Sequence, residues 1–229
     1  MSAEATDHQF VVAIDGPAAS GKSSTAKRVA VRLGIHHADS GMLYRAATVA
    51  RLGRNGEPEE WTPESVLSAA ARVTLARHGA SFEVRLNDSP MGQELNDATV
   101  TALVSLVAKM QSVRSWVNEQ MRRCARDGPI VVDGRDMGTA VFPRAQLKIF
   151  LVANPRERAR RRLLQRLGRA PMDDEIASEA EALKQRDAKD AAQTQQAVDA
   201  VVIDTTHLSQ DEQVERIVEM AVRAGAPRG

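Results

Sequence analysis

A glycine-rich loop between an apolar run and a helical pattern constrains this chain more than any other feature. The segment Gly16-Pro17-Ala18-Ala19-Ser20-Gly21-Lys22-Ser23 follows the apolar run 10–14 and precedes a helical pattern that ends at Gly34. Glycines let consecutive backbone N–H groups turn toward phosphate oxygens, and the following helix adds its positive end. A strand before the motif and a helix after it form the context that this motif requires. We therefore predict that residues 16–24 hold the phosphates of a nucleotide.

The residue types that close the loop predict specific contacts. Lys22 is placed to neutralise charge between the β- and γ-phosphates, and the Ser23 hydroxyl is placed to ligate Mg²⁺. Asp133 ends the apolar run 130–132 and is our candidate for the strand-end acid that supports this Mg²⁺. The alternative is that Asp133 is an ordinary turn residue after a strand.

Short apolar runs alternate with helical patterns along the chain. Such runs without polar alternation are typical of parallel strands buried on both faces. They lie at 10–14, 35–38 (the weakest), 130–132, 148–152 and 201–203. Helical patterns end at Gly34 and Gly53, and Asn154-Pro155-Arg156-Glu157 reads as a helix start with a capping box. This alternation predicts an α/β fold with a mainly parallel sheet.

One interval is too long for a simple crossover. About ninety residues separate the runs at 35–38 and 130–132, roughly three times a strand-helix-strand unit. Within it, 73–75 and 82–86 read as two strands, and Phe82, Val84 and Leu86 alternate with polar residues. We predict an insertion over 63–105 that contains an antiparallel hairpin. The alternative is a few extra core helices.

Composition restricts the class of protein and its partners. The 31 basic and 30 acidic residues give a net charge of +1, which provides no reason to expect nucleic-acid or membrane binding. The single cysteine, Cys124, excludes an internal disulfide and a cysteine zinc cluster. The N-terminus has no signal-peptide pattern, and no apolar run reaches the ~18 residues of a membrane span. We expect a cytoplasmic protein, monomeric by default.

Arginines crowd directly after the strand predicted at 148–152. Arg158, Arg161 and Arg162 share one helix face by spacing. Ligands of open α/β sheets bind beyond strand ends, so these arginines are candidates to close over a transferring phosphoryl group. The alternative is a solvated surface helix. Further along, helical spacing extends an apolar face to Arg186, Asp190 and Gln193. For Arg186 and Asp190 the alternative is a surface ion pair four residues apart.

Several motifs together resemble those of the bacterial cytidylate kinases. The chain contains, in order, GPAASGKSS, DSGMLYRAA, DGRDMGTAVFP, KIFL followed by ERARRR, QRD with a further Asp, and VVIDTT. The DSG-x-x-YR and DGRDMGT-x-VFP segments are specific to that family, whereas the glycine loop alone is not. The resemblance extends over nearly the whole chain. It implies transfer of a phosphoryl group from ATP to CMP or dCMP, with Mg²⁺.

The resemblance also implies an architecture and a set of site residues. It implies one adenylate-kinase-like domain over 1–229, with a parallel five-stranded core, an acceptor-binding insertion over 63–105 and an arginine-rich lid over 155–175. The implied ATP-binding residues are Gly16, Pro17, Ala18, Ala19, Ser20, Gly21, Lys22, Ser23 and Ser24. The implied acceptor-binding residues are Ser40, Arg45, Ser105, Arg114, Arg135, Asp136, Arg186 and Asp190. Lys22, Arg158, Arg161 and Arg162 are the implied catalytic residues.

The chain departs from the family pattern in one place. Many members carry an arginine three residues after the position of Asp190, where this chain has Gln193. One positive contact to the acceptor is therefore expected to be missing.

Other functions remain open on the residues alone. Neither a guanine-reading Asn-Lys-x-Asp motif nor an ABC-type signature is present. A small-metabolite kinase of the shikimate or gluconate type would need a carboxylate as base, and Asp39 could serve. A regulatory nucleotide-binding protein would leave the acceptor residues without a role. The five histidines fall outside the motifs and are expected to be structural or surface residues.

Overall fold

The runs predicted as strands lie side by side in one sheet. The structure is a computed structural model that describes residues 9–227. Over these residues the strand order is β3-β4-β2-β6-β1-β7-β8, and β5 pairs with β4. The strands are β1 (Val11–Asp15), β2 (His36–Asp39), β3 (Val73–His78), β4 (Ser81–Leu86), β5 (Ser89–Pro90), β6 (Ile130–Gly134), β7 (Leu147–Val152) and β8 (Val201–Asp204). Strands β2, β6, β1, β7 and β8 pair in parallel, which confirms the predicted core.

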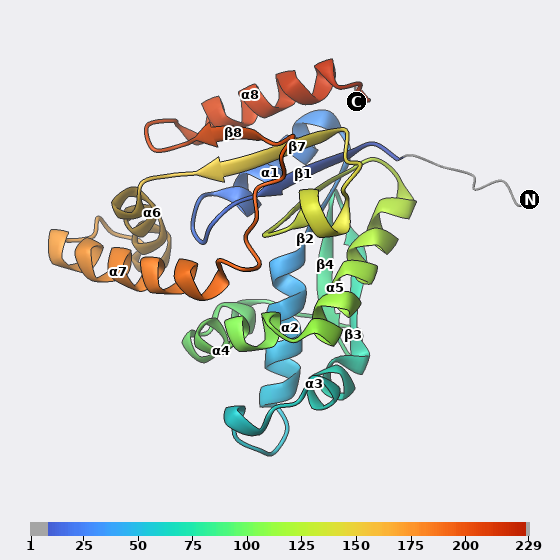
Figure 1. The fold of residues 1–229 in the computed structure, drawn as a ribbon, viewed down its shortest axis with the longest axis vertical. Coiled ribbons are helices and arrows are strands. Elements are labelled where there is room, and N and C mark those ends of the chain that lie inside the picture. The colour runs from blue at the N-terminus through green and yellow to red at the C-terminus, as the bar shows by residue number, and fades with distance from the viewer. Residues whose placement is uncertain (1–8, 228–229) are drawn as a thin grey trace, which may run out of the picture.

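Helices cover both faces of this sheet (Figure 1). They are α1 (Lys22–Leu33), α2 (Ser40–Leu52), α3 (Pro63–Ala69), α4 (Ala98–Ala108), α5 (Gln111–Cys124), α6 (Pro155–Leu167), α7 (Asp173–Asp190) and α8 (Gln210–Arg223). Alternate residues of β1 serve the two faces: Val12 and Ile14 pack with α1 and α8, whereas Val11 and Ala13 pack with α2 and α5. Burial on both faces explains why the runs lack polar alternation. The predicted α/β class is confirmed.

The interval between β2 and β6 contains both of the predicted possibilities. Strands β3 and β4 form an antiparallel hairpin in the register Val73↔Leu86, which confirms that part of the prediction. The hairpin continues the main sheet, because His37 of β2 pairs with Ser81 of β4. Helices α3, α4 and α5 also belong to this interval, and residues such as Val66, Val107 and Val117 are fully buried in the core. Helix α4 extends to Ala108, beyond the expected boundary at 105.

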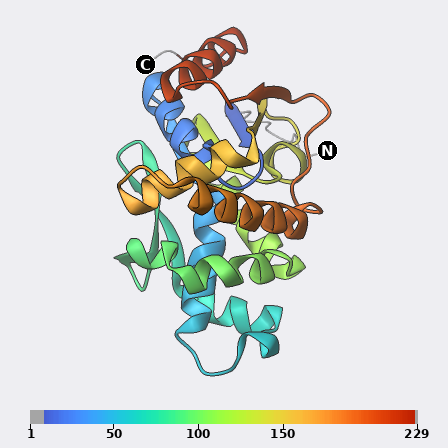
Figure 2. The ribbon, with the colours of Figure 1, turned by 90° about the vertical axis from the view of Figure 1, so that its left-hand side faces the viewer.

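The helix pair α6–α7 lies beyond the carboxyl ends of the parallel strands (Figures 1 and 2). Asn154 caps α6 by accepting the backbone N–H of Arg156, as predicted. The predicted capping box does not form, because the Glu157 carboxylate pairs with Arg160 and Arg161 instead. Leu163 of α6 and Leu183 of α7 cluster with Ala18. This packing places the helix pair directly on the glycine loop.

Among the described residues, no helix combines the length and the apolar character that a membrane crossing would require.

Candidate active site

The glycine loop joins β1 to α1 and requires glycine for steric reasons. At Gly16 the backbone φ is 148°, and a Cβ would lie 2.2 Å from the carbonyl oxygen of Leu151. Gly21 adopts φ 90° at the N-terminus of α1. Side chains disfavour such conformations, so both glycines are needed for the loop to turn here. The predicted strand-loop-helix context is present.

Lys22 lies inside the loop that it belongs to. Its Nζ donates to the carbonyl oxygen of Pro17 at 2.7 Å, and the residue is 8% exposed. Burial, together with the nearby Arg135, lowers the pKa of Lys22 to about 7. Asp133, Asp39 and Asp15 oppose this shift only in part, and negatively charged phosphates beside the amine would favour its charged form further.

Ser23 and Asp133 meet as predicted, and an unpredicted histidine joins them. The Ser23 hydroxyl donates to Asp133 Oδ2 at 2.5 Å, and His37 Nε2 lies 2.8 Å from Asp133 Oδ1. His37 is buried, and its place beside a motif residue was missed. Asp39 lies opposite Asp133 in the parallel register of β2 and β6. Burial and the adjacent Asp133 raise the pKa of Asp39.

Three predicted acceptor residues form one cluster, and one of them, Arg135, contacts the glycine loop. Arg135 Nη1 donates to the carbonyl oxygen of Gly16 at 3.0 Å, and its Nη2 lies 3.4 Å from Asp190 Oδ2. Arg186 Nε lies 3.7 Å from the same carboxylate oxygen, and burial lowers the pKa of Arg186 to about 10. The Arg186–Asp190 pair is therefore part of a largely buried cluster and not an exposed surface pair.

A second group joins α5 to the segment after β6. The Arg114 guanidinium pairs with the Asp136 carboxylate, and Arg114 Nη1 donates to the carbonyl oxygen of Ala108 at 3.2 Å. Burial raises the pKa of Asp136 although Arg114 opposes the shift. Tyr44 has a buried hydroxyl without a hydrogen-bond partner. Burial raises the pKa of Tyr44, Arg114 opposes this shift, and Asp136 adds to it. Tyr44 belongs to the DSG-x-x-YR motif, which was the signal available in the sequence.

The remaining predicted acceptor residues lie on α2 and α4. Ser40 donates to the carbonyl oxygen of Asp133 at 3.0 Å. Arg45 donates to the carbonyl oxygen of Leu95 at 2.7 Å and to Thr101 Oγ1 at 3.1 Å. Ser105 lines a cleft of about 230 Å³ between α4 and α7, together with Arg162 and Arg186. Of Ser40, Arg45 and Ser105, only Ser105 lines this cleft, and the three have separate contacts.

The three predicted lid arginines do not reach a common target. Arg158 donates to the carbonyl oxygen of Ala18 at 2.9 Å, in the glycine loop. Arg161 donates to the carbonyl oxygen of Thr205 at 2.6 Å, just after β8. Arg162 pairs with Glu179 of α7 at 3.1 Å. Shared spacing on a helix therefore did not translate into shared contacts.

Asp187 is a loop contact that the sequence reasoning missed. It pairs with Arg158 at 2.7 Å and accepts the backbone N–H of Ala18 at 3.3 Å. Its position next to Arg186 in the QRD motif was the available signal. Gln193 lies past the end of α7, where its backbone N–H donates to the carbonyl oxygen of Asp190 at 3.0 Å. It is therefore not on the helical face that the spacing predicted.

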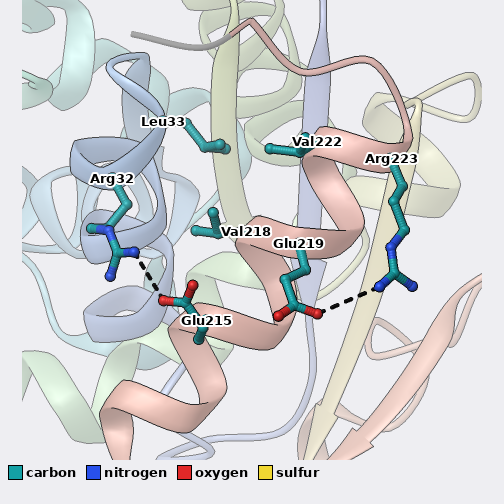
Figure 3. Close-up of a pocket in the computed structure, with 7 residues that line it drawn as sticks. All are labelled: Arg32, Leu33, Glu215, Val218, Glu219, Val222 and Arg223. Atoms are coloured by element: carbon teal, nitrogen blue, oxygen red, sulfur yellow. Dashed lines mark hydrogen bonds and ion pairs between the residues drawn. The ribbon is translucent and has the colours of Figure 1, made fainter.

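A larger groove lies away from all of these residues. It measures about 410 Å³ between α1 and α8, and Arg32, Val218 and Arg223 are among the residues that line it (Figure 3). Ion pairs Arg32–Glu215 and Arg223–Glu219 border it. Since no motif residue faces this groove, the candidate site is the region of the glycine loop and the α4–α7 cleft.

A mainly parallel sheet with the glycine loop between β1 and α1 defines the class, a P-loop fold. A sequence profile of the cytidylate kinase family matches residues 12–223. The chain is 39% identical over 218 residues to the cytidylate kinase of Chlorobaculum tepidum, covering 92% of each. It is 41% identical over 214 residues to that of Geobacillus kaustophilus, covering 91% of this chain and 95% of the relative. The chain belongs to the cytidylate kinase family, a family of phosphotransferases.

A solved structure resembles the fold as well. A crystal structure of an uncharacterized protein from Eubacterium ventriosum matches with a TM-score of 0.51 at 11% identity. The match covers 93% of this chain and 99% of the other, and it supports the fold alone.

Proposed function

We propose that this chain transfers the γ-phosphoryl group of ATP to CMP and dCMP, giving CDP and dCDP. The observation that carries the proposal is the position of Arg135, which bridges the Gly16 carbonyl oxygen and the Asp190 carboxylate. A residue expected at the acceptor thus touches the loop expected at the donor. Membership of the cytidylate kinase family supports the same acceptor.

The chemistry required of the protein is mainly positioning and charge neutralisation. An acceptor phosphate is already anionic, so an in-line transfer to it needs no strong general base. Lys22 and the loop N–H groups would hold the donor phosphates. Of the three lid arginines, Arg158 is the one that contacts the glycine loop, at Ala18. Arg161 and Arg162 would have to leave Thr205 and Glu179 to act on the phosphoryl group.

The donor set at Ser23 fits Mg²⁺. Because the Ser23 hydroxyl donates its proton to Asp133, its lone pairs remain free for a cation. No cluster of three or more metal-ligating side chains occurs over residues 9–227. This agrees with an ion held by one hydroxyl, phosphate oxygens and water. When bound there, Mg²⁺ would neutralise charge on the donor phosphates.

The resemblance to the cytidylate kinases implies separate roles for the acceptor residues. Arg45 and Arg135 would bind the acceptor phosphate, because guanidinium groups bind phosphate with two parallel hydrogen bonds. Arg114, Asp136 and Ser105 would read the base. Arg186 and Asp190 would hold the pentose, and a carboxylate at Asp190 can accept from sugar hydroxyls. Ser40, whose hydroxyl donates to the Asp133 carbonyl oxygen in this structure, would also contact the acceptor nucleotide.

The test is release of ADP from MgATP by the purified chain, measured with and without CMP. A kinase releases ADP only when CMP is present, whereas a regulatory ATPase releases it without an acceptor. Lys22→Ala should abolish CMP-dependent release and leave the circular dichroism spectrum unchanged. Substantial turnover by Lys22→Ala would contradict the role proposed for this lysine.

We also propose a cellular location and an oligomeric state for the enzyme. ATP, CMP and dCMP are metabolites of the cytoplasm, so we place the activity there, in a monomer. Size-exclusion chromatography with light scattering tests the monomer, and a dimeric mass would contradict it.

A further inference from the structure

Asp15 ends β1 and directly precedes the glycine loop. The residue is 4% exposed. Oδ1 accepts the backbone N–H of Met137 at 2.8 Å, and Oδ2 accepts the backbone N–H of Gly138 at 2.7 Å. Both oxygens therefore hold the same turn. This turn directly follows Arg135 and Asp136, two of the proposed acceptor residues.

Two consecutive residues, Asp15 and Gly16, connect the glycine loop to the segment after β6. Asp15 holds the turn at Met137 and Gly138, and the next residue, Gly16, accepts from Arg135 at 3.0 Å. Asp136 also anchors the turn, because its carbonyl oxygen accepts the N–H of Ala140 at 2.8 Å. A shift of the Asp15 carboxylate would thus move the backbone that carries Arg135 and Asp136.

The turn has little freedom to settle elsewhere. A Cβ on Gly138 would lie 3.2 Å from Lys148 Cδ and 3.4 Å from Asp15 Oδ2. Close packing on both sides fixes the turn between β7 and Asp15. A buried carboxylate is costly unless hydrogen bonds satisfy it, and backbone N–H groups are strong partners for it. The carboxylate accepts the N–H groups of the first two residues of the helical turn Met137–Val141.

We propose that Asp15 is a positioning residue, which ties the turn at Met137 and Gly138 to the phosphate loop and thereby aligns Arg135 and Asp136 with the acceptor. This inference rests on the proposed function. Asp15 touches neither nucleotide in this account. Loss of its carboxylate should therefore affect the acceptor much more than the donor.

The test compares Asp15→Asn with the wild-type chain by calorimetric binding of CMP and of a non-hydrolysable ATP analogue. We expect the dissociation constant for CMP to rise about tenfold, since one charged hydrogen bond to the turn is lost. The constant for the ATP analogue should stay within about twofold. Asp211→Asn, which removes a carboxylate from an exposed ion pair with Arg28, is the matched control and should change neither constant.

A second variant approaches the turn from its other side. Gly138→Ala crowds Asp15 and Lys148, so it should weaken CMP binding in the same selective way and serves if Asp15→Asn does not fold. Unchanged CMP binding in a folded variant would overturn the proposal. An equal loss for CMP and the ATP analogue would also overturn it, because this would indicate damage to the phosphate loop itself.

Amide hydrogen exchange separates this inference from the proposed function. The N–H groups of Met137 and Gly138 should exchange faster in Asp15→Asn than in the wild type, whatever the acceptor is. If these N–H groups exchange faster in Asp15→Asn but the wild-type chain does not phosphorylate CMP, the proposed function is refuted and the anchoring role stands. Unchanged exchange at both residues would refute the anchoring.

Discussion

Asp15 gives the chain a pH dependence that one substitution should remove. Burial raises the pKa of Asp15 from 3.8 to about 6, although the N–H groups of Gly138 and Met137 oppose the shift. Asp136 adds to the shift, and Lys22 acts against it. The folded state therefore holds this proton more tightly than the unfolded chain does. Protonated Asp15 therefore favours the folded state at low pH. This contribution to the free energy of unfolding decreases as the pH rises toward about 6.

Asp15→Asn cannot titrate, so its stability relative to the wild type should increase with pH. We expect a relative gain of about 1 kcal/mol between pH 5 and pH 7, because one pKa unit corresponds to about 1.4 kcal/mol. Urea unfolding of both proteins at these two pH values measures it. Equal pH dependence of the two proteins would contradict a raised pKa at Asp15.

Asp190 is expected to discriminate between ribose and deoxyribose. Its carboxylate lies within 3.4 Å of Arg135 and 3.7 Å of Arg186, and its side chain is 14% exposed. If it accepts from the 2′-hydroxyl, Asp190→Ala should raise the KM for CMP by about tenfold and that for dCMP by less. Steady-state kinetics with both acceptors measures this. Equal increases in the two KM values would remove the pentose assignment.

At the residue scale, the sequence indicated candidate site residues better than it indicated the residues that they contact. Lys22 and Ser23 follow from the spacing of the glycine-loop motif, whereas Asp133 follows from its position at the end of an apolar run; Ser23 and Asp133 are in contact. The contact of His37 with Asp133 could not, because it depends on the pairing of β2 with β6. The contacts of Asp15 and Asp187 depend in the same way on loops far apart in the sequence.

At the element scale, helix α6 offers a comparison of two arginines on one helix. Arg158 is 5% exposed at its side chain and contacts the loop carbonyl oxygen of Ala18. Arg160 is half exposed and pairs only with Glu157 among the described residues. Arg158→Ala should lower kcat by about 10³-fold or more, as expected of an arginine at a transferring phosphoryl group. Arg160→Ala should change kcat less than about twofold.

Equal losses from the two substitutions would contradict a specific role for Arg158. They would instead indicate that the net positive charge of α6 matters. Single-turnover measurements with both substrates saturating keep substrate binding out of this comparison.

Element boundaries reflect what local sequence can and cannot specify. The ends of α1 and α2 and the start of α6 were predictable, because Gly34, Gly53 and Asn154 are local signals. Helix α4 was not separated from the insertion, since its apolar residues become a core only against α2 and α5. Addition of the hairpin to the edge of the main sheet likewise required the tertiary structure.

At the scale of the whole molecule, the size of the cleft between α4 and α7 leads us to expect movement of α6 and α7. The cleft between α4 and α7 measures about 230 Å³. This is smaller than the ~300–1,000 Å³ of most ligand pockets. We therefore expect α6 and α7 to shift relative to α4 when nucleotides bind, which also excludes water from the transferring group. Small-angle scattering should change on addition of CMP with a non-hydrolysable ATP analogue, and identical profiles would contradict this motion.

The most direct test of the central claim is ADP release from MgATP across a panel of acceptors. The panel contains CMP, dCMP, UMP, AMP, GMP and shikimate, each assayed with the same purified chain. We predict turnover with CMP and dCMP far above that with the other four. Activity with shikimate and none with any nucleotide would contradict the proposed acceptor, while the phosphate loop would keep its role.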